Sequence, residues 1–415
     1  MHGRDLNDQS VQALWHRAEK AGLSRRRFMV LLGSSGAAAV LAACTPRTTT
    51  PAPSPTTPSP TPVRNINKPT PEQFFIPLGT NAETRLEVMA NREYAMPNGL
   101  FFVRSHTSSP LVDPKTWTLS IEGAGVARPF QLTYDELLKL PTHTVTRYVE
   151  CAGNGRSFFD TLLKNPAQGG QWRLGAYGVA EWTGVRLRDI LNPAGILSAA
   201  VDVMPIGMDS TRVERPMPVD KAMEDDTLVA YMMNGDIIPI DHGFPARVLA
   251  PGWVGINSVK WVNRITVSTG PIRTDKNTTS YVLVGPDYQP QPPALGPPVN
   301  SQVIKSALCL PWPATLRAGQ QKVVGYAWSP FGKIRGVEMS TDGGKTFENA
   351  SLAGPNVEQA GTRWEYSFSA TPAVTSLTPR ATDEAGNVQH DISEQKWNQQ
   401  GYLFGAMVPH PVEVK

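Results

Sequence analysis

The chain has 415 residues, of which 40% are hydrophobic and 18% charged, with a formal net charge of +3 at pH 7. This content allows sizeable cores in two domains, while the slight charge, with no basic run interleaved with aromatic residues, disfavours nucleic-acid binding. The three cysteines are too few for a disulfide scaffold or an all-cysteine metal cluster.

Residues 1–44 have the pattern of an export signal. Residues 24–28 (SRRRF) match a twin-arginine motif, and the apolar run at 29–41 is shorter than the roughly 20 residues that span a bilayer. The small residues that follow, ending at Cys44, resemble a lipobox. We therefore expect export of a folded protein by the twin-arginine route, with its cofactor already inserted. A lipid anchor at Cys44 would be the membrane contact.

Residues 45–68 are rich in Pro, Thr and Ser and nearly free of apolar residues. Such a segment cannot bury enough surface to offset the entropy lost on ordering it. We expect a semi-extended tether between the anchor and the folded part of the chain.

Two domains are expected after the tether. Residues 69–300 mix short strands, short helices and loops rich in Pro and Gly, which is typical of an α+β domain. The proline-rich segment 290–298 ends this domain. From residue 301 to 415 the pattern changes to short strands separated by regular turns, which predicts an immunoglobulin-like β-sandwich.

Three local patterns define elements in the first domain. Residues 133–141 predict a short helix, because Thr133 and Glu136 have the spacing of a capping box. Residues 143–149 alternate polar and apolar side chains like a half-buried strand, and residues 185–191 predict a second short helix. No GxGxxG motif follows a strand, which disfavours a nicotinamide cofactor.

The second domain shows strand and turn patterns in succession. Residues 340–345 (STDGGK) have a hairpin-turn composition, and residues 383–387 (DEAGN) predict another turn. The expected strands cover 321–329, 334–339, 346–349, 362–369 and 377–382.

Cys151 lies in the most informative stretch, YVECAGNGR at 148–156. It ends a β-type run and enters a Gly/Asn turn, five residues before Arg156. Gly153 and Gly155 allow positive φ and a close backbone approach to a ligand, and Arg156 offers a planar fork for an oxyanion. The pattern presents one thiolate to a metal and one cation to an anion. The alternative is an ordinary buried thiol, since free cysteine is among the most buried residue types.

Other candidate anion-binding groups recur along the first domain. Arg104 and His106 are two apart, on one face of an extended segment. His242 and Arg247 share a turn, and a glycine-rich loop precedes Lys260. Together these groups predict one large anionic ligand, such as a phosphate-bearing cofactor, and a small anionic substrate.

These motifs resemble the sulfite oxidase family of molybdopterin-dependent oxidoreductases, which includes bacterial sulfite dehydrogenases and the molybdenum domain of plant nitrate reductases. The resemblance implies a sulfite-oxidase-type molybdopterin-binding domain, a C-terminal immunoglobulin-like dimerisation domain, a molybdenum–molybdopterin cofactor and a homodimer. It rests on strings in family order: FVRSH, ECAGNGR, WTGVRLRDIL, MNGDIIPIDHGFPARVLAPGWVG, SVKW, GYAWS, STDGGKTF and RATDEAGNVQ.

The resemblance also implies roles for particular residues. Cys151 corresponds to the thiolate ligand of molybdenum, and Arg104, Arg156 and Tyr281 correspond to residues of the substrate pocket. The implied reaction is oxidation of sulfite to sulfate by oxygen-atom transfer. The implied cofactor-binding set is Phe102, Val103, Arg104, Ser105, His106, Asp209, His242, Arg247, Ser258, Val259 and Lys260.

Two departures from the family pattern bear on substrate and partner. Animal members carry a basic pair and an acid just before the tyrosine, whereas this chain has Thr-Thr-Ser at 278–280, so a less positive pocket wall is expected there. The second departure is that no haem domain is expected before the molybdenum domain, and no CxxCH haem-attachment motif is present. Electrons would therefore leave to a separate carrier, such as cytochrome c or another extracytoplasmic acceptor.

Three other functions remain open from the sequence. The same scaffold serves other molybdenum oxidoreductases, which reduce a sulfoxide or nitrate. A non-catalytic surface lipoprotein would use the immunoglobulin-like domain as an adhesive module. A Cys–His hydrolase has His106, His143 and His242 available, although no nucleophile motif supports it.

Overall fold

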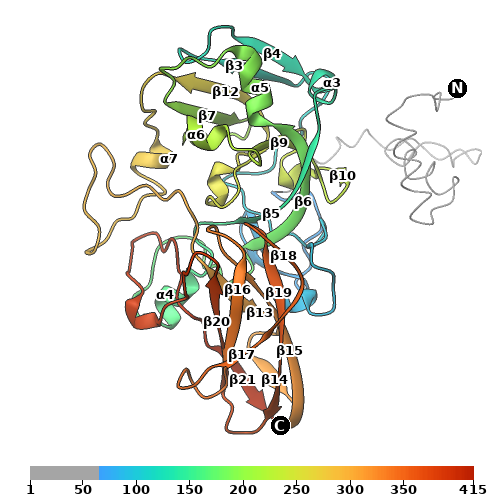
Figure 1. The fold of residues 1–415 in the computed structure, drawn as a ribbon, viewed down its shortest axis with the longest axis vertical. Helices are drawn as coiled ribbons and strands as arrows, with labels where there is room; N and C mark the ends of the chain where they lie inside the picture. The colour runs from blue at the N-terminus through green and yellow to red at the C-terminus, as the bar shows by residue number, and fades with distance from the viewer. Residues whose placement is uncertain (1–64) are drawn as a thin grey trace, which may run out of the picture. The chain divides into compact units, whose positions relative to one another are not determined.

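The computed structural model describes residues 65–415, and Figure 1 shows the arrangement of their elements. The expected export signal, the lipobox at Cys44 and residues 45–64 of the tether lie outside the described residues. Within residues 65–415, no helix combines the length and apolar character needed to cross a bilayer.

Two five-stranded sheets frame the first half of the described chain. One has strand order β10–β9–β6–β5, with β11 also paired to β9; the other has order β4–β3–β12–β7–β8, in which β12 runs parallel to β3 and antiparallel to β7. A separate hairpin joins β1 to β2. The bounds are β1 (Phe75–Leu78), β2 (Asn81–Thr84), β3 (Thr118–Glu122), β4 (Phe130–Thr133), β5 (His143–Glu150), β6 (Tyr177–Arg186), β7 (Asp202–Gly207), β8 (Met217–Pro218), β9 (Leu228–Met233), β10 (Asp236–Ile237), β11 (Arg247–Leu249) and β12 (Val262–Ser268).

The helices are short and lie in the connections between strands. They are η1 (Leu86–Met89), α3 (Tyr134–Leu137), α4 (Ser157–Thr161), α5 (Leu187–Ala194), α6 (Val219–Ala222), η2 (Ile240–His242), η3 (Gly255–Asn257), α7 (Asp275–Thr278) and η4 (Ile392–Glu394). Because none of them forms a layer along a parallel sheet, the first domain is α+β, as the sequence predicts.

Predictions that rest on a few neighbouring residues are confirmed in the first domain. The capping box of α3 is confirmed, since the Thr133 hydroxyl accepts the Glu136 N–H and the Glu136 carboxylate accepts the Thr133 N–H. The strand expected at 143–149 is β5. The helix expected at 185–191 begins two residues later than predicted, because Val185 and Arg186 still pair with β9 as the end of β6.

The second half of the described chain is a sandwich of two sheets, with strand orders β13–β15–β19–β18 and β14–β21–β20–β16–β17. Trp364, Met339 and Leu377 are fully buried in the core between them. The predicted hairpin at 340–345 joins β16 to β17, and the Asp342 carboxylate closes it by accepting two backbone N–H groups at 3.0 Å. The immunoglobulin-like expectation is thus confirmed. The bounds are β13 (Lys305–Leu308), β14 (Ala314–Leu316), β15 (Gly319–Trp328), β16 (Ile334–Ser340), β17 (Glu348–Asn349), β18 (Ser351–Val357), β19 (Gly361–Ala370), β20 (Ser376–Asp383) and β21 (His410–Val414).

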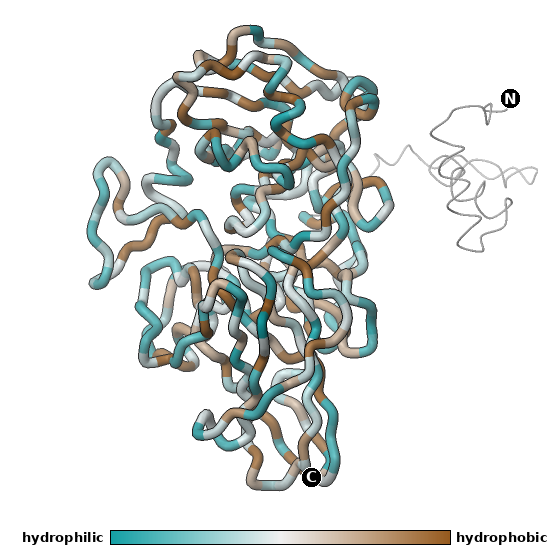
Figure 2. Tube along the Cα trace, viewed as in Figure 1, coloured by the Kyte–Doolittle hydropathy of each residue, from teal (hydrophilic) through white to brown (hydrophobic). Residues whose placement is uncertain are grey.

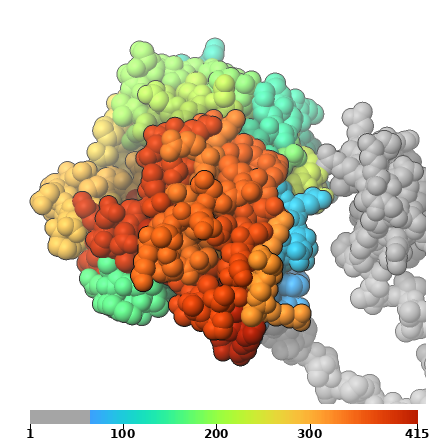
Figure 3. All heavy atoms as spheres, turned by 60° about the horizontal axis from the view of Figure 1, so that its bottom comes forward, coloured from blue at the N-terminus to red at the C-terminus, as the bar shows by residue number. Residues whose placement is uncertain are grey.

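The two halves share a hydrophobic core. The Tyr177 ring of β6 stacks on Trp328 of β15, with ring centroids 3.9 Å apart. Phe158 of α4 packs against Phe404 from the C-terminal segment, which is the stretch between η4 and β21. Hydrophobic residues run along strands of both halves (Figure 2). Figure 3 shows the C-terminal segment beside the segment that carries α4. The second half therefore contributes directly to the surroundings of Cys151, which lies between β5 and α4.

Candidate active site

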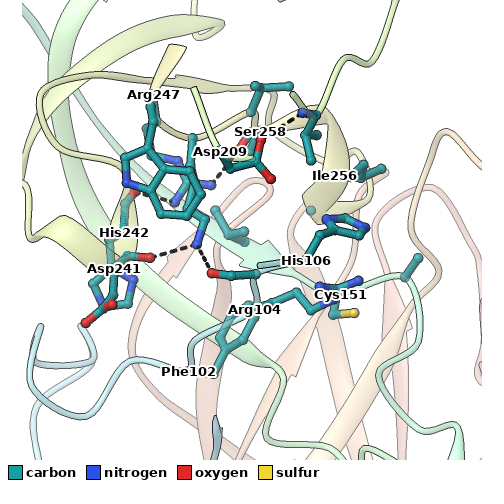
Figure 4. A pocket seen from close by; sticks show the side chains of 18 of the residues that line it. Phe102, Arg104, His106, Cys151, Asp209, Asp241, His242, Arg247, Ile256 and Ser258 are labelled. Carbon is teal, nitrogen blue, oxygen red and sulfur yellow. Dashed lines mark hydrogen bonds between the residues drawn. The ribbon is translucent and has the colours of Figure 1, made fainter. Parts of the chain in front are cut away.

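Cys151 directly follows β5 and lines a cavity (Figure 4). Its N–H donates to the Ala176 carbonyl, and its own carbonyl accepts the Asn154 N–H, both at 2.9 Å, which closes the turn. Gly153 leaves no room for a side chain, since a Cβ there would lie 2.2 Å from the Arg156 guanidinium. Strand end and turn therefore hold a single thiol, 6% exposed, at the cavity wall.

Two cations, the half-buried Lys260 and the buried Arg247, line the same cavity, and neither forms an ion pair within residues 65–415. Lys260 Nζ donates to Ser105 Oγ at 2.7 Å and to the Asp241 carbonyl oxygen at 2.8 Å. The Arg247 guanidinium donates to backbone carbonyl oxygens at 3.0 and 2.9 Å. These hydrogen-bond partners are neutral oxygens, and the nearby carboxylates of Asp241 and Asp209 offset the charge of Lys260 only in part. Burying such charges is costly unless a ligand supplies the counter-charge.

The pKa shifts of these groups also indicate an anion-binding site. Burial lowers the pKa of Arg247 to about 9. Burial and the nearby Arg247 hold the pKa of Lys260 well below its usual range, and burial together with Lys68 does so for His242. The Asp209 carboxylate lines the cavity but already accepts the Val213 N–H at 2.8 Å. An anion bound here would raise these pKa values again, which is the behaviour of a phosphate site.

Tyr281, His106 and Arg104 form a second group on the cavity wall. The Tyr281 hydroxyl lies 3.2 Å from His106 Nε2 and 3.5 Å from the Arg104 guanidinium. Burial and Arg104 lower the pKa of His106 to about 3, so the imidazole is neutral at neutral pH. Burial opposes the charge of Arg104, but Tyr281 and Cys151 outweigh it and raise the pKa of Arg104. A permanent cation therefore lies near the thiol.

Tyr281 is held in a strained conformation. Its φ is +53°, which is uncommon for a residue with a side chain and is found at functional sites. Its ring stacks on Tyr402 of the C-terminal segment at 5.2 Å with 10° between the planes. Residues from both halves of the molecule therefore set the position of the Tyr281 ring.

Arg247 and His106, one residue from each group, lie on opposite sides of the cavity. Figure 4 shows Cys151 and His106 on one side and His242 and Arg247 on the other. Within residues 65–415, no group of three or more His, Cys, Asp or Glu side chains is placed to hold a metal. Cys151 would supply one thiolate to a metal bound in this cavity. Molybdopterin fits this set of donors: its sulfur atoms would share the metal with Cys151, and its phosphate would meet Arg247 and Lys260.

The cavity gathers most of the predicted site residues from several distant stretches of the chain. They are Phe102, Arg104, Ser105, His106, Cys151, Asp209, His242, Arg247, Ser258, Val259, Lys260 and Tyr281. Their roles remain predictions, but their shared location is what those roles require.

Val103 is placed in the cofactor-binding set by the resemblance, yet the structure turns it away from the cavity. It is fully buried and exchanges two backbone hydrogen bonds of 2.9 Å with Ala82. Its side chain packs with Phe75 and Ala82 in a separate cluster. The reason is the alternation of an extended segment, in which neighbouring side chains point to opposite sides.

Arg156 is likewise predicted at the substrate, and the structure does not bring it into the cavity lining. Its guanidinium donates to the backbone carbonyl oxygens of Gly170 at 2.8 Å and Gln400 at 2.6 Å. It also faces the ring of Tyr402 at 5.4 Å. In this arrangement Arg156 joins the Cys151 turn to the C-terminal segment, because the carbonyl oxygens of two loops converge on it.

Lys68 contacts the site residue His242, a contact that sequence reasoning missed. It stands in the segment assigned to the tether, but its Nζ donates to the carbonyl oxygens of Asn98 and Phe101 and lies 3.4 Å from His242 Nε2. Its backbone N–H donates to the Asp241 carboxylate at 2.7 Å. Burial lowers the pKa of Lys68 to about 7. No local pattern separates this lysine from the polar tether, so its partners appear only in the folded chain.

Known families match both halves of the chain. Residues 106–275 match the oxidoreductase molybdopterin binding domain, and residues 298–408 match the Mo-co oxidoreductase dimerisation domain. The chain is 35% identical over 345 residues to the sulfite oxidase of Gallus gallus, covering 79% of this chain and 74% of the relative. The chain belongs to the sulfite oxidase family. The predicted molybdenum–molybdopterin cofactor and the predicted fold are thereby confirmed.

Two further comparisons define how far the likeness extends. The chain is 35% identical over 353 residues to mitochondrial sulfite oxidase of Mus musculus, covering 81% of this chain and 64% of that relative. It therefore spans less than two thirds of the mouse protein. A solved structure, the sulfane dehydrogenase SoxCD from Paracoccus pantotrophus, matches with a TM-score of 0.72 at 27% identity, covering 83% of this chain and 87% of that one.

Proposed function

We propose that this protein oxidises sulfite to sulfate and passes the electrons to a separate carrier. The observation that carries the proposal is the shared cavity of Cys151, Arg104 and Tyr281, with the cations Lys260 and Arg247 on its wall. When bound, the molybdenum cofactor supplies the oxygen-atom and electron transfer. The protein's part is to bind, orient and neutralise the reacting anion.

Each wall residue has a role that follows from its charge. Arg104 keeps its charge and offers a planar fork, so it binds the sulfite dianion and offsets its charge. The Tyr281 hydroxyl, 3.2 Å from a neutral His106, donates to the substrate or exchanges that bond with the imidazole. The segment 278–280 contributes no residue to the cavity lining, whereas Arg104 does and lies beside Tyr281.

The test combines metal analysis with turnover. We expect molybdenum in the protein matured through its natural route, and reduction of ferricyanide that depends on sulfite. Reduced viologen with nitrate or a sulfoxide under anaerobic conditions tests the reductase alternatives. Turnover only in the reductive assay would replace the proposed reaction, and protein that matures without molybdenum would favour a non-catalytic lipoprotein.

For Arg104→Gln we expect a rise in KM for sulfite of about tenfold or more, because one charged hydrogen-bond donor to a dianion is lost. Glutamine keeps the polarity and much of the volume, so kcat changes less than KM. Initial-rate kinetics over a range of sulfite concentrations measure both values. An unchanged KM would remove Arg104 from substrate binding.

The partners and location follow as further parts of the proposal. A second copy of the chain would associate through the dimerisation domain, giving a twofold homodimer. Cytochrome c or another extracytoplasmic carrier would accept the electrons. The twin-arginine motif and Cys44 support export and lipid anchoring outside the cytoplasm.

A further inference from the structure

We propose that Lys305, in the immunoglobulin-like domain, positions Cys151 for metal binding through its ion pair with Glu150. The inference rests on the proposed role of Cys151 as the metal ligand. It adds a positioning residue that comes from outside the molybdopterin-binding domain.

Glu150 is the residue just before Cys151, and its carboxylate is fully buried. One carboxylate oxygen accepts from Lys305 Nζ at 2.6 Å and from Asn154 Nδ2 at 2.9 Å. The other accepts the indole N–H of Trp328 at 2.9 Å. Three donors, shared between its two oxygens, hold this carboxylate and with it the end of β5.

Lys305 holds the far side of the turn as well. Its Nζ also donates to the Asn154 carbonyl oxygen at 3.1 Å, and the Asn154 N–H closes the turn onto the Cys151 carbonyl at 2.9 Å. The Asn154 side chain in turn accepts the Ala176 N–H at 3.0 Å. One ammonium group therefore fixes the residue before Cys151 and the residue that closes its loop.

The pair is better explained by positioning than by stability alone. Glu150 is 0% and Lys305 2% exposed, and replacing such a buried pair with apolar groups is often neutral or stabilising. The apolar stack of Tyr177 on Trp328 already joins the two domains here. A metal ligand, by contrast, requires its flanking backbone to be held, and partners beyond the ligand itself are what hold it.

The test variant is the double change Glu150→Gln with Lys305→Met, which removes the ion pair without leaving a buried charge. In the metal-free protein we expect alkylation of Cys151 by iodoacetamide to be faster by about tenfold or more, since the turn opens more often without its charged hydrogen bonds. Mass spectrometry of the peptide that contains Cys151 separates it from the other cysteines. In the loaded protein, kcat with sulfite falls by about tenfold or more while KM is unchanged, because Arg104 is untouched.

A matched control is Lys221→Met, which removes a lysine that is buried to a similar degree, away from the cavity lining. Lys221 Nζ pairs with the Glu224 carboxylate and donates to the Pro251 carbonyl. This control should leave both readouts at the wild-type level. If the double variant does not fold, Trp328→Phe removes one hydrogen bond from Glu150 and is judged by the same readouts.

The outcomes separate this inference from the proposed function. Wild-type alkylation and wild-type kcat in the double variant would overturn the positioning role. If the wild-type protein contains no molybdenum and does not oxidise sulfite, the proposed function is rejected. In that case the alkylation rate of Cys151 still decides whether Lys305 holds the turn.

Discussion

The Cys151→Ser variant is expected to oxidise sulfite more than about 100-fold more slowly than the wild type. Loss of a residue that only supports a metal ligand already costs up to about 100-fold in activity, and loss of the ligand itself should cost more. The thiolate is the form that binds metal, and a serine hydroxyl has no comparable anionic form at neutral pH. The fold should survive, since the turn depends on backbone bonds to Ala176 and Asn154 rather than on the sulfur. Turnover, metal content and the urea unfolding curve measure activity, metal binding and stability, respectively.

Cys309→Ser is the matched control, because Cys309 is the other free cysteine within residues 65–415 and is also buried. It follows β13 in the sandwich and lies outside the cavity lining. Burying a hydroxyl there should cost about 1–3 kcal/mol of stability and leave kcat unchanged. Wild-type turnover by Cys151→Ser would remove Cys151 from the metal site.

The second large effect is expected at Lys260. Lys260→Met should weaken retention of the cofactor by about tenfold to 100-fold, because a charged hydrogen bond to its phosphate is lost. The metal-free variant should be no less stable than the wild type, since burial and Arg247 already depress the pKa of Lys260 and its charge disfavours the empty fold. Molybdenum and pterin content after extended dialysis, with thermal unfolding of the metal-free protein, measure both effects.

Lys221→Met again serves as the control, and it should keep the cofactor at the wild-type level. A Lys260→Met variant that retains its cofactor, or whose metal-free form unfolds much more readily, would show that Lys260 supports the fold and not the ligand.

Features set by neighbours in the chain were predictable from the sequence. The capping box at Thr133 and the turn at 340–345 need only the spacing of a few polar residues and glycines, so they form as expected. The turn that follows Cys151 is also indicated by its Gly and Asn residues, but partners from distant parts of the chain, such as Lys305, hold it in the fold. Motif order along the chain further indicated the family, and the comparisons confirm it.

Boundaries between elements were less predictable, as the start of α5 shows. Val185 and Arg186 suit either a helix or a strand, and their hydrogen bonds to β9 decide for the strand. Such pairing depends on residues more than forty positions away in the sequence, so the local pattern of polar and apolar residues does not reveal it.

A lone thiol in a glycine turn, and a set of Arg, His and Lys residues that match one family, could be read from the chain alone. Which of these residues meet depends on the folded chain. It sets Lys68 beside His242, places the Arg156 guanidinium on two backbone carbonyls and joins Glu150 to Lys305. The physical reason is that long, flexible side chains take their direction from partners far along the chain, and folding brings those partners together.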